Sequence, residues 1–122
     1  MLLKALRNGL GQLVIFADWI TRPARRQRNS DSQAQIARDC QDLALYQFRA
    51  CPFCVKVRRH LHRLNLPVEL RDAKQAAHGQ ILLEQGGKVQ VPCLRIQEKD
   101  HVRWLYESRA IIAYLEERFG AR

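Results

Sequence analysis

The segment LALYQFRACPFCVKVRR at residues 43–59 is the sequence feature that most constrains this chain. It begins with an apolar run typical of a buried strand, continues into two cysteines separated by two residues, and ends in the pattern of a basic amphipathic helix. Pro52 stands where helices often have a proline in their first turn. The segment therefore predicts a strand, a tight turn that carries Cys51 and Cys54, and a helix that begins directly after Cys51.

A thiol at the start of a helix lies near free backbone N–H groups and the positive end of the helix dipole, which both stabilise a thiolate. Cys51 has that place in the predicted turn, and neighbouring Arg and Lys side chains add positive potential. We therefore expect Cys51 to be the nucleophile of a thiol–disulfide exchange. Cys54 falls one turn into the helix on its apolar side, where it would be shielded until it attacks a mixed disulfide on Cys51.

A zinc site and a purely structural pair are the other interpretations of this CxxC pattern. Structural zinc takes four ligands, and the sequence has no second CxxC and no paired Cys/His motif. Cys40, Cys93, His60 and His62 would complete such a site only by coincidence of folding. A CxxC at a strand-to-helix turn is instead typical of redox proteins, and we predict no metal ligands.

The sequence that surrounds this motif predicts a compact α/β domain. Helices are expected at about 52–65, at 73–85 before Gly86-Gly87, and from Ser108 to 119, and further strands at 67–71, 91–97 and 102–106. The expected order is β-α-β-α-β-β-α. Because a helix joins the first two strands, they should be parallel, whereas the last two should form a hairpin. We expect a four-stranded mixed sheet with helices on both faces.

Residues 1–20 form an amphipathic helical pattern. Its apolar stripe comprises Leu3, Leu6, Leu10, Leu13, Ala17 and Ile20, widened by Leu2 and Val14, with Lys4, Arg7, Asn8 and Gly11 on the other side. The uninterrupted apolar run is far shorter than the roughly 20 residues of a spanning helix, and no small-x-small cleavage site follows it. We expect a helix that either lies in a membrane interface or packs on protein, and the pattern favours neither.

The polar, basic residues 21–42 predict a linker with a helical turn or more around 33–38. The formal net charge of +9 suits nucleic acid, anionic lipid or acidic small molecules. Because the basic run lacks interleaved aromatic residues, we expect no specific nucleic-acid binding, and residues 1–28 are the candidate for peripheral membrane contact. The predicted organisation is an N-terminal helix and basic linker at 1–42, followed by one domain at 43–122.

The four cysteines are too few and too irregularly spaced for the disulfide framework of a secreted domain. A reducing compartment is therefore expected. We predict a cytoplasmic location, at the inner face of the membrane if residues 1–28 contact lipid.

Residues 43–119 resemble a glutaredoxin and, equally, the N-terminal thioredoxin-fold domain of glutathione transferases. CPFC at 51–54 is close to the CPYC typical of dithiol glutaredoxins. Val91-Pro92 stands where thioredoxin-fold proteins have a cis proline facing the active-site cysteine, and Glu107-Ser108 is similar to the Glu/Gln-Ser pair that holds the γ-glutamyl end of glutathione in transferases. The resemblance implies a thioredoxin-like fold with an N-terminal helical extension, and glutathione as co-substrate.

The resemblance also implies which residues meet glutathione. The backbone of Val91, before Pro92, would bind the peptide-like middle of the molecule, and the helix start at Ser108 would receive its γ-glutamyl carboxylate. The full expected set is Phe53, Val91, Pro92, Glu107, Ser108 and Arg49, with Lys56 and Lys88 as further candidates for the glycine carboxylate.

Three features depart from a minimal glutaredoxin. Cys93 after the proline is not required by the family pattern and is either a buried small hydrophobe or a third redox thiol near Cys51. The segment 104–108 replaces the usual two glycines and is closer to the transferase-type domain. Residues 1–42 have no counterpart, and their combination with such a domain resembles small bacterial proteins.

These patterns favour a glutathione-dependent thiol–disulfide oxidoreductase that reduces protein or glutathione mixed disulfides through CPFC. Its expected partners are glutathione and disulfide-containing or glutathionylated proteins. One alternative is a glutathione transferase-like domain, although a transferase would continue past Arg122 into an all-helical domain. The other is a non-catalytic iron–sulfur or redox docking module at a membrane.

Overall fold

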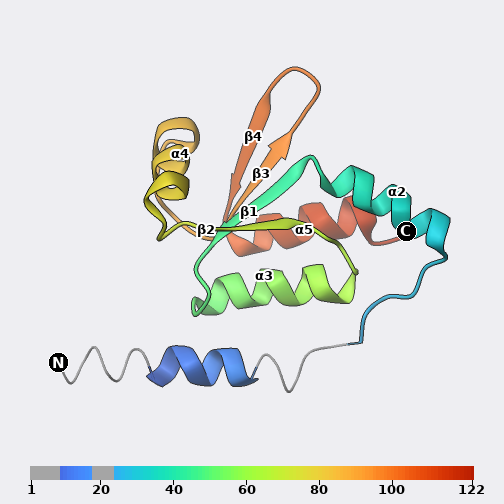
Figure 1. Cartoon of the computed structure of the whole chain (residues 1–122), viewed down its shortest axis with the longest axis horizontal. Helices are drawn as coiled ribbons and strands as arrows, with labels where there is room; N and C mark the ends of the chain where they lie inside the picture. Colours follow the sequence, from blue (N-terminus) through green and yellow to red (C-terminus); the bar gives the residue numbers. More distant parts are fainter. Residues whose placement is uncertain (1–8, 18–23) are drawn as a thin grey trace.

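A computed structural model of the chain describes residues 9–17 and 24–122, and Figure 1 gives its arrangement. The elements are α2 (Ser30–Cys40), β1 (Leu43–Gln47), α3 (Pro52–Arg63), β2 (Glu69–Asp72), α4 (Ala76–Gly86), β3 (Cys93–Gln97), β4 (Val102–Tyr106) and α5 (Ser108–Phe119). A further short helix over residues 9–17 precedes them. From β1 onward the order is the predicted β-α-β-α-β-β-α.

The four strands form one mixed sheet in the order β2-β1-β3-β4. β1 and β2 are parallel, and β3 is antiparallel to both β1 and β4. Helices α3 and α5 cover one face of the sheet, whereas α4 covers the other (Figure 1). All five residues of β1 are buried, as expected for a strand covered on both faces. The predicted thioredoxin-like α/β fold is confirmed.

Some predicted boundaries were wrong by a few residues. α4 begins at Ala76, three residues later than expected, and ends at Gly86, one residue later than expected. Its C-cap is Gly87, whose φ of 97° suits glycine. β3 begins at Cys93, because Pro92 has no N–H to donate to a strand ladder.

The segment expected to be a linker contributes a full helix to the packed body. α2 spans 11 residues, and the side chain of Asn29 caps it by accepting a 2.7 Å hydrogen bond from the N–H of Ser32. Ile36 and Cys40 of α2 are buried in the core cluster beneath α3 and α5. Because Ile36 and Cys40 are the buried residues among the eleven of α2, the apolar pattern of this segment was too sparse to predict the packing.

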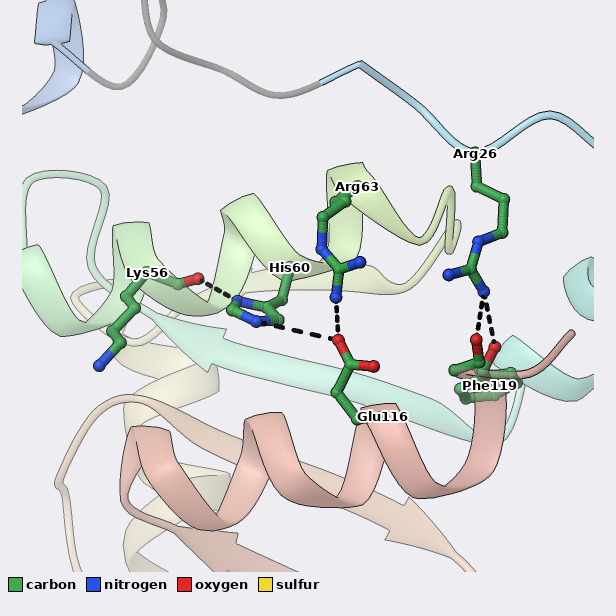
Figure 2. A network of polar contacts seen from close by, with 7 residues as sticks. Arg26, Lys56, His60, Arg63, Glu116 and Phe119 are labelled. Atoms are coloured by element: carbon green, nitrogen blue, oxygen red, sulfur yellow. Dashed lines mark hydrogen bonds and ion pairs between the residues drawn. The ribbon is translucent and has the colours of Figure 1, made fainter.

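The basic run before α2 hydrogen-bonds to the domain. Arg26 donates to the carbonyl oxygens of Phe119 and Gly120, at 3.2 and 2.7 Å, where α5 ends (Figure 2). Arg25 donates to Nδ1 of His62 at 3.2 Å. Cations at a helix C-terminus are stabilised by the exposed carbonyl groups there. Half-buried Arg26 is therefore held against the domain, whereas Arg25 stays exposed and Arg22 lies outside the described residues.

Polar contacts also join α3 to α5. Arg63 forms an ion pair with Glu116, and His60 Nε2 lies 4.0 Å from the same carboxylate (Figure 2). The ring of His60 also contacts the carbonyl oxygen of Lys56, at 3.3 Å. The side chains of His60 and Arg63 are 28% and 39% exposed, so this contact lies at the surface margin of the α3–α5 interface.

The helix at 9–17 turns its glycine side toward the domain. A Cβ atom at Gly11 would lie 2.9 Å from the Cβ atom of Ala50, so the two backbones approach closely beside the cysteine motif. Val14 and Ile15 are half-buried. The exposed large side chains of this helix are Leu10, Leu13 and Phe16, which are 62%, 63% and 58% exposed.

Leu10, Leu13 and Ala17 of the predicted apolar stripe are therefore exposed, whereas Val14 is half-buried. The other members, Leu2, Leu3, Leu6 and Ile20, lie outside the described residues. Over residues 9–17 and 24–122, no helix is long and apolar enough to cross a bilayer.

Candidate functional site

The predicted site segments leave the sheet at one edge. Tyr46 in β1 pairs with Cys93 in β3, and Cys93 pairs with Tyr106 in β4, so the ends of these strands are aligned. Three segments follow directly from those ends: the turn 48–51 after β1, Val91-Pro92 before β3, and Glu107-Ser108 after β4. The strand register thus brings the three sequence landmarks to the same side of the domain.

Cys51 and Cys54 lie at the N-terminus of α3 in contrasting surroundings. Cys51 is the N-cap residue, has extended backbone angles, makes no side-chain capping bond, and is half-exposed. Cys54 is fully buried, and its sulfur accepts a 3.5 Å hydrogen bond from the N–H of Phe48. Burial raises the pKa of the Cys54 thiol to about 12, and Cys51 adds to the rise, whereas the Phe48 N–H opposes it. The predicted contrast between an accessible and a shielded thiol is confirmed.

Arg58 of α3 holds the turn that leads to these thiols. Its guanidinium donates to the side-chain oxygen of Gln47, to the carbonyl oxygen of Phe48 at 3.2 Å, and to that of Arg49 at 2.6 Å. The sequence suggested only positive potential for Arg58. Its spacing of four residues from Cys54 would have placed it on the same helix face, which is the signal that could have identified it.

The Val91-Pro92 bond is cis, as the resemblance implied. Val91 precedes β3 and is half-buried. Cys93 is fully buried on the α4 face of the sheet, in a cluster with Tyr46 and Leu82. Burial raises the pKa of the Cys93 thiol to about 11, although a hydrogen bond with a tyrosine hydroxyl opposes the rise. These surroundings support the interpretation of Cys93 as a buried small hydrophobe.

Helix α5 begins at Ser108 as predicted, and its N-cap is Glu107. Glu107 has φ 76° and ψ 126°, and no side chain caps the helix. A non-glycine residue in such a conformation costs about 1–3 kcal/mol, and such residues cluster at ligand sites. The carbonyl of Glu107 accepts from the N–H of Ile111 at 3.1 Å, so the helix starts regularly behind the strained residue.

The other predicted glutathione contacts lie at the surface. Phe53 is 62% exposed, and Arg49, Lys56 and Lys88 are also exposed. Lys88 lies over the ring of Tyr106, with its Nζ atom 4.6 Å from the centroid, and its carbonyl accepts a 2.9 Å hydrogen bond from the Tyr106 hydroxyl. Tyr106, which the sequence did not single out, therefore ties the segment before Val91 to the end of β4.

All four cysteines are free thiols. In the part of the chain that the structure describes, no three His, Cys, Asp or Glu side chains are grouped so as to hold a metal ion.

The fold and the cysteine-bearing helix start define a thioredoxin-fold protein of the glutaredoxin and transferase type. The family model for the glutathione S-transferase N-terminal domain matches residues 45–122, and the chain belongs to this family.

Relatives of the chain are enzymes of greater length. Mouse prostaglandin E synthase 2 is 34% identical over 91 residues, which make up 75% of this chain and 23% of the mouse protein. A crystal structure of maleylacetoacetate isomerase from Anaeromyxobacter dehalogenans 2CP-1 with glutathione in its active site is 31% identical, with a TM-score of 0.51 over 64% of this chain and 38% of that one. Another structure of the same isomerase, with bound dicarboxyethyl glutathione and citrate, is 32% identical, with a TM-score of 0.51 over 64% and 37% of the two chains.

Proposed function

We propose that this protein is a glutathione-dependent thiol–disulfide oxidoreductase that reduces protein or glutathione mixed disulfides. The observation that carries the proposal is the contrast at the start of α3, where half-exposed Cys51 is the uncapped N-cap residue and Cys54 is buried one turn further. Free N–H groups at the helix start stabilise a thiolate at the first position. The second thiol is within reach of the first but shielded from solvent.

The reaction would begin when the Cys51 thiolate attacks one sulfur of a substrate disulfide. A mixed disulfide forms on Cys51, and the other substrate sulfur leaves as a thiolate that takes a proton. Either a glutathione thiolate or Cys54, after losing its proton, then attacks and releases the bound thiol. Two glutathione molecules supply the two electrons and become glutathione disulfide, which restores both cysteines.

Glutathione would bind along the sheet edge beside Cys51. The backbone of Val91 would pair with the peptide-like middle of the tripeptide, and the open N-terminus of α5 at Glu107-Ser108 would receive its γ-glutamyl carboxylate. Phe53 and Arg49 would border the site as exposed side chains. The isomerase that resembles this domain binds glutathione in its active site, which supports this choice of co-substrate.

The test is the reduction of hydroxyethyl disulfide with glutathione as donor. We expect Cys51→Ser to abolish activity, because no other thiol is accessible at the helix start, and Cys54→Ser to retain the route that glutathione itself completes. Cys93→Ala, which changes a buried cysteine on the α4 face, is the matched control and should retain activity per folded molecule. Full activity of Cys51→Ser would refute the mechanism.

A glutathione transferase-like activity is the second candidate, and membership of the transferase N-terminal domain family favours it equally. In that case the site would direct the thiolate of bound glutathione at an electrophile rather than use the protein thiols. The test is conjugation of glutathione to chlorodinitrobenzene. Conjugation by both wild type and Cys51→Ser, with no reduction of hydroxyethyl disulfide, would establish the transferase-like activity in place of the oxidoreductase.

We also propose peripheral contact with anionic membranes from the cytoplasmic side. Because Arg25 and Arg26 bond to the domain, the support comes from the exposed Leu10, Leu13 and Phe16 of the 9–17 helix. Apolar side chains on one side of a surface helix are the usual means of interfacial binding. With Phe53 also exposed, the contact would lie beside the cysteine motif.

Flotation with phosphatidylserine-containing vesicles tests this contact. We expect the Leu10→Ser/Leu13→Ser double variant to float less than wild type, whereas Val89→Ser, at another exposed apolar side chain, should float normally. Equal partitioning of wild type and the double variant would remove the membrane proposal.

A further inference from the structure

Arg58 connects the dithiol helix to the strand before it. It is half-buried on α3, four residues after Cys54, and its guanidinium donates to oxygens of three consecutive residues, Gln47, Phe48 and Arg49. The side-chain oxygen of buried Gln47 and two backbone carbonyls are thus held by one group. A guanidinium has five donors in a rigid planar fork, which suits several acceptors at once.

The segment that Arg58 holds touches both cysteines. The carbonyl of Phe48, which accepts from Arg58, also accepts from the N–H of Cys51 at 3.4 Å and so closes the turn before the first thiol. The N–H of the same residue donates to the sulfur of Cys54 at 3.5 Å. A shift of Phe48 would therefore move the backbone of Cys51 and remove a donor from Cys54.

We propose that Arg58 is a positioning residue for the dithiol, acting through Phe48 to set how fast Cys54 resolves a mixed disulfide on Cys51. The inference rests on the roles proposed above for the two cysteines. In the resolving step the Cys54 sulfur must carry negative charge as it attacks. The N–H of Phe48 favours that charge directly, and the positive charge of Arg58 favours it through space.

Positive charge alone does not account for this arrangement. Lys56 lies on the same helix, two residues closer to the motif, and its exposed side chain adds a similar charge. An exposed cation contributes little because water and salt screen it. A lysine in place of Arg58 would keep the charge but lose the fork that holds three oxygens, so Arg58→Lys separates geometry from charge.

The experiment follows the reaction of the reduced protein with dithiobis(nitrobenzoate), without glutathione. Cys51 attacks the reagent and releases one thionitrobenzoate anion, and a mixed disulfide remains. Cys54 then attacks the Cys51 sulfur, forms the intramolecular disulfide and releases the second anion. Stopped-flow absorbance resolves the two releases, and Cys54→Ser, which gives only the first, assigns them.

We expect Arg58→Met to slow the second release by about tenfold or more, the size of a lost charge-assisted hydrogen bond, and Arg58→Lys to slow it by a smaller factor. The first release should change less, because Cys51 keeps its place at the helix start. Lys56→Met is the matched control and should stay within about threefold of wild type in both phases. Circular dichroism establishes the folded fraction, and if Arg58→Met does not fold, Arg58→Lys decides.

The proposal is overturned if the rate of the second release in the folded Arg58 variants stays within the range found for Lys56→Met. It is also overturned if both releases slow by the same factor. The first result would mean that the hydrogen bonds of Arg58 do not affect the reaction of Cys54. The second would mean that the variants perturb the site as a whole. Because the assay contains no glutathione, failure of the glutathione-dependent activity would leave these two releases intact, so the two proposals fail separately.

Discussion

Helices α2 and α3 begin in opposite ways. At the start of α2, the side chain of Asn29 accepts from the N–H of Ser32, so a conventional cap closes the helix. At the start of α3, the N-cap is Cys51, whose side chain makes no such bond. α2 then ends in buried Cys40, whereas α3 begins at half-exposed Cys51. The same residue type is thus structural at one helix end and accessible at another.

An open helix start is not enough to mark a functional site. Helix α4 also lacks a side-chain cap at Gln75, yet its first turn carries no thiol. α4 follows a strand end at the same sheet edge, since Asp72 of β2 pairs with Gln47 of β1. α3 and α5 differ from it because one carries a thiol and the other a strained Glu107. The site is therefore identified by the coincidence of an open helix start with reactive chemistry.

The largest expected difference between the two regions is in thiol reactivity. Burial raises the pKa of the Cys40 thiol to about 11, so at pH 8 only about one molecule in a thousand would carry that thiolate, and its sulfur is also enclosed. We expect iodoacetamide to modify Cys51 at least about a hundredfold faster than Cys40 in the native protein. Peptide mapping after timed quenching measures both rates. Equal modification rates at Cys51 and Cys40 in the native protein would contradict the contrast.

Replacement of Ile36 by alanine should affect stability rather than chemistry. Its side chain is fully buried in the core between α2 and the sheet, so Ile36→Ala should lower the free energy of unfolding by about 2–5 kcal/mol. Phe53→Ala, at an exposed side chain beside the thiols, is the opposite case and should change stability little while raising the KM for glutathione. Urea unfolding combined with disulfide reduction at low temperature separates the two effects. The comparison would be contradicted if Phe53→Ala lowered the free energy of unfolding and Ile36→Ala did not.

Substitutions at the N-caps of α2 and α5 should change the stability of the fold by a smaller amount. Asn29→Ala removes a capping hydrogen bond and should cost about 1 kcal/mol of stability without change in thiol reactivity. Glu107→Gly is its counterpart at α5: it relieves a positive φ and should not destabilise the fold, but it should weaken glutathione binding. Thermal unfolding and glutathione titration measure the pair. Destabilisation by Glu107→Gly together with unchanged binding would argue against a ligand role.

The sequence predicted the fold and the place of the two thiols because both depend on local patterns. Strand and helix periodicity, Pro52 after Cys51, and Gly87 after α4 are signals carried by neighbouring residues. The hydrogen bonds of Arg58 and Arg26 were not predicted. Those of Arg26 join residues far apart in sequence, and those of Arg58 depend on the direction that a long side chain takes. Charge patterns alone do not distinguish a solvated arginine from one that holds backbone carbonyls.

The smallest expected effect concerns acid stability at the end of α2. A hydrogen bond from Arg122 lowers the pKa of Asp39, and Gln35 contributes a second one. Because the folded-state pKa lies below the unfolded value of about 3.9, this carboxylate stabilises the fold above that pH, and the contribution disappears as the pH falls through the folded value. The pair is partly solvated, so screening keeps its contribution small.

Arg122→Gln should therefore lower stability slightly at pH 6 and hardly at all at pH 2.5, which urea unfolding at the two pH values measures. Arg103→Gln, which removes a similarly solvated ion pair with Glu98 on the far hairpin, is the control for a general loss of positive charge. An equal loss at both pH values for Arg122→Gln would mean that its contacts with α2 act by packing rather than charge.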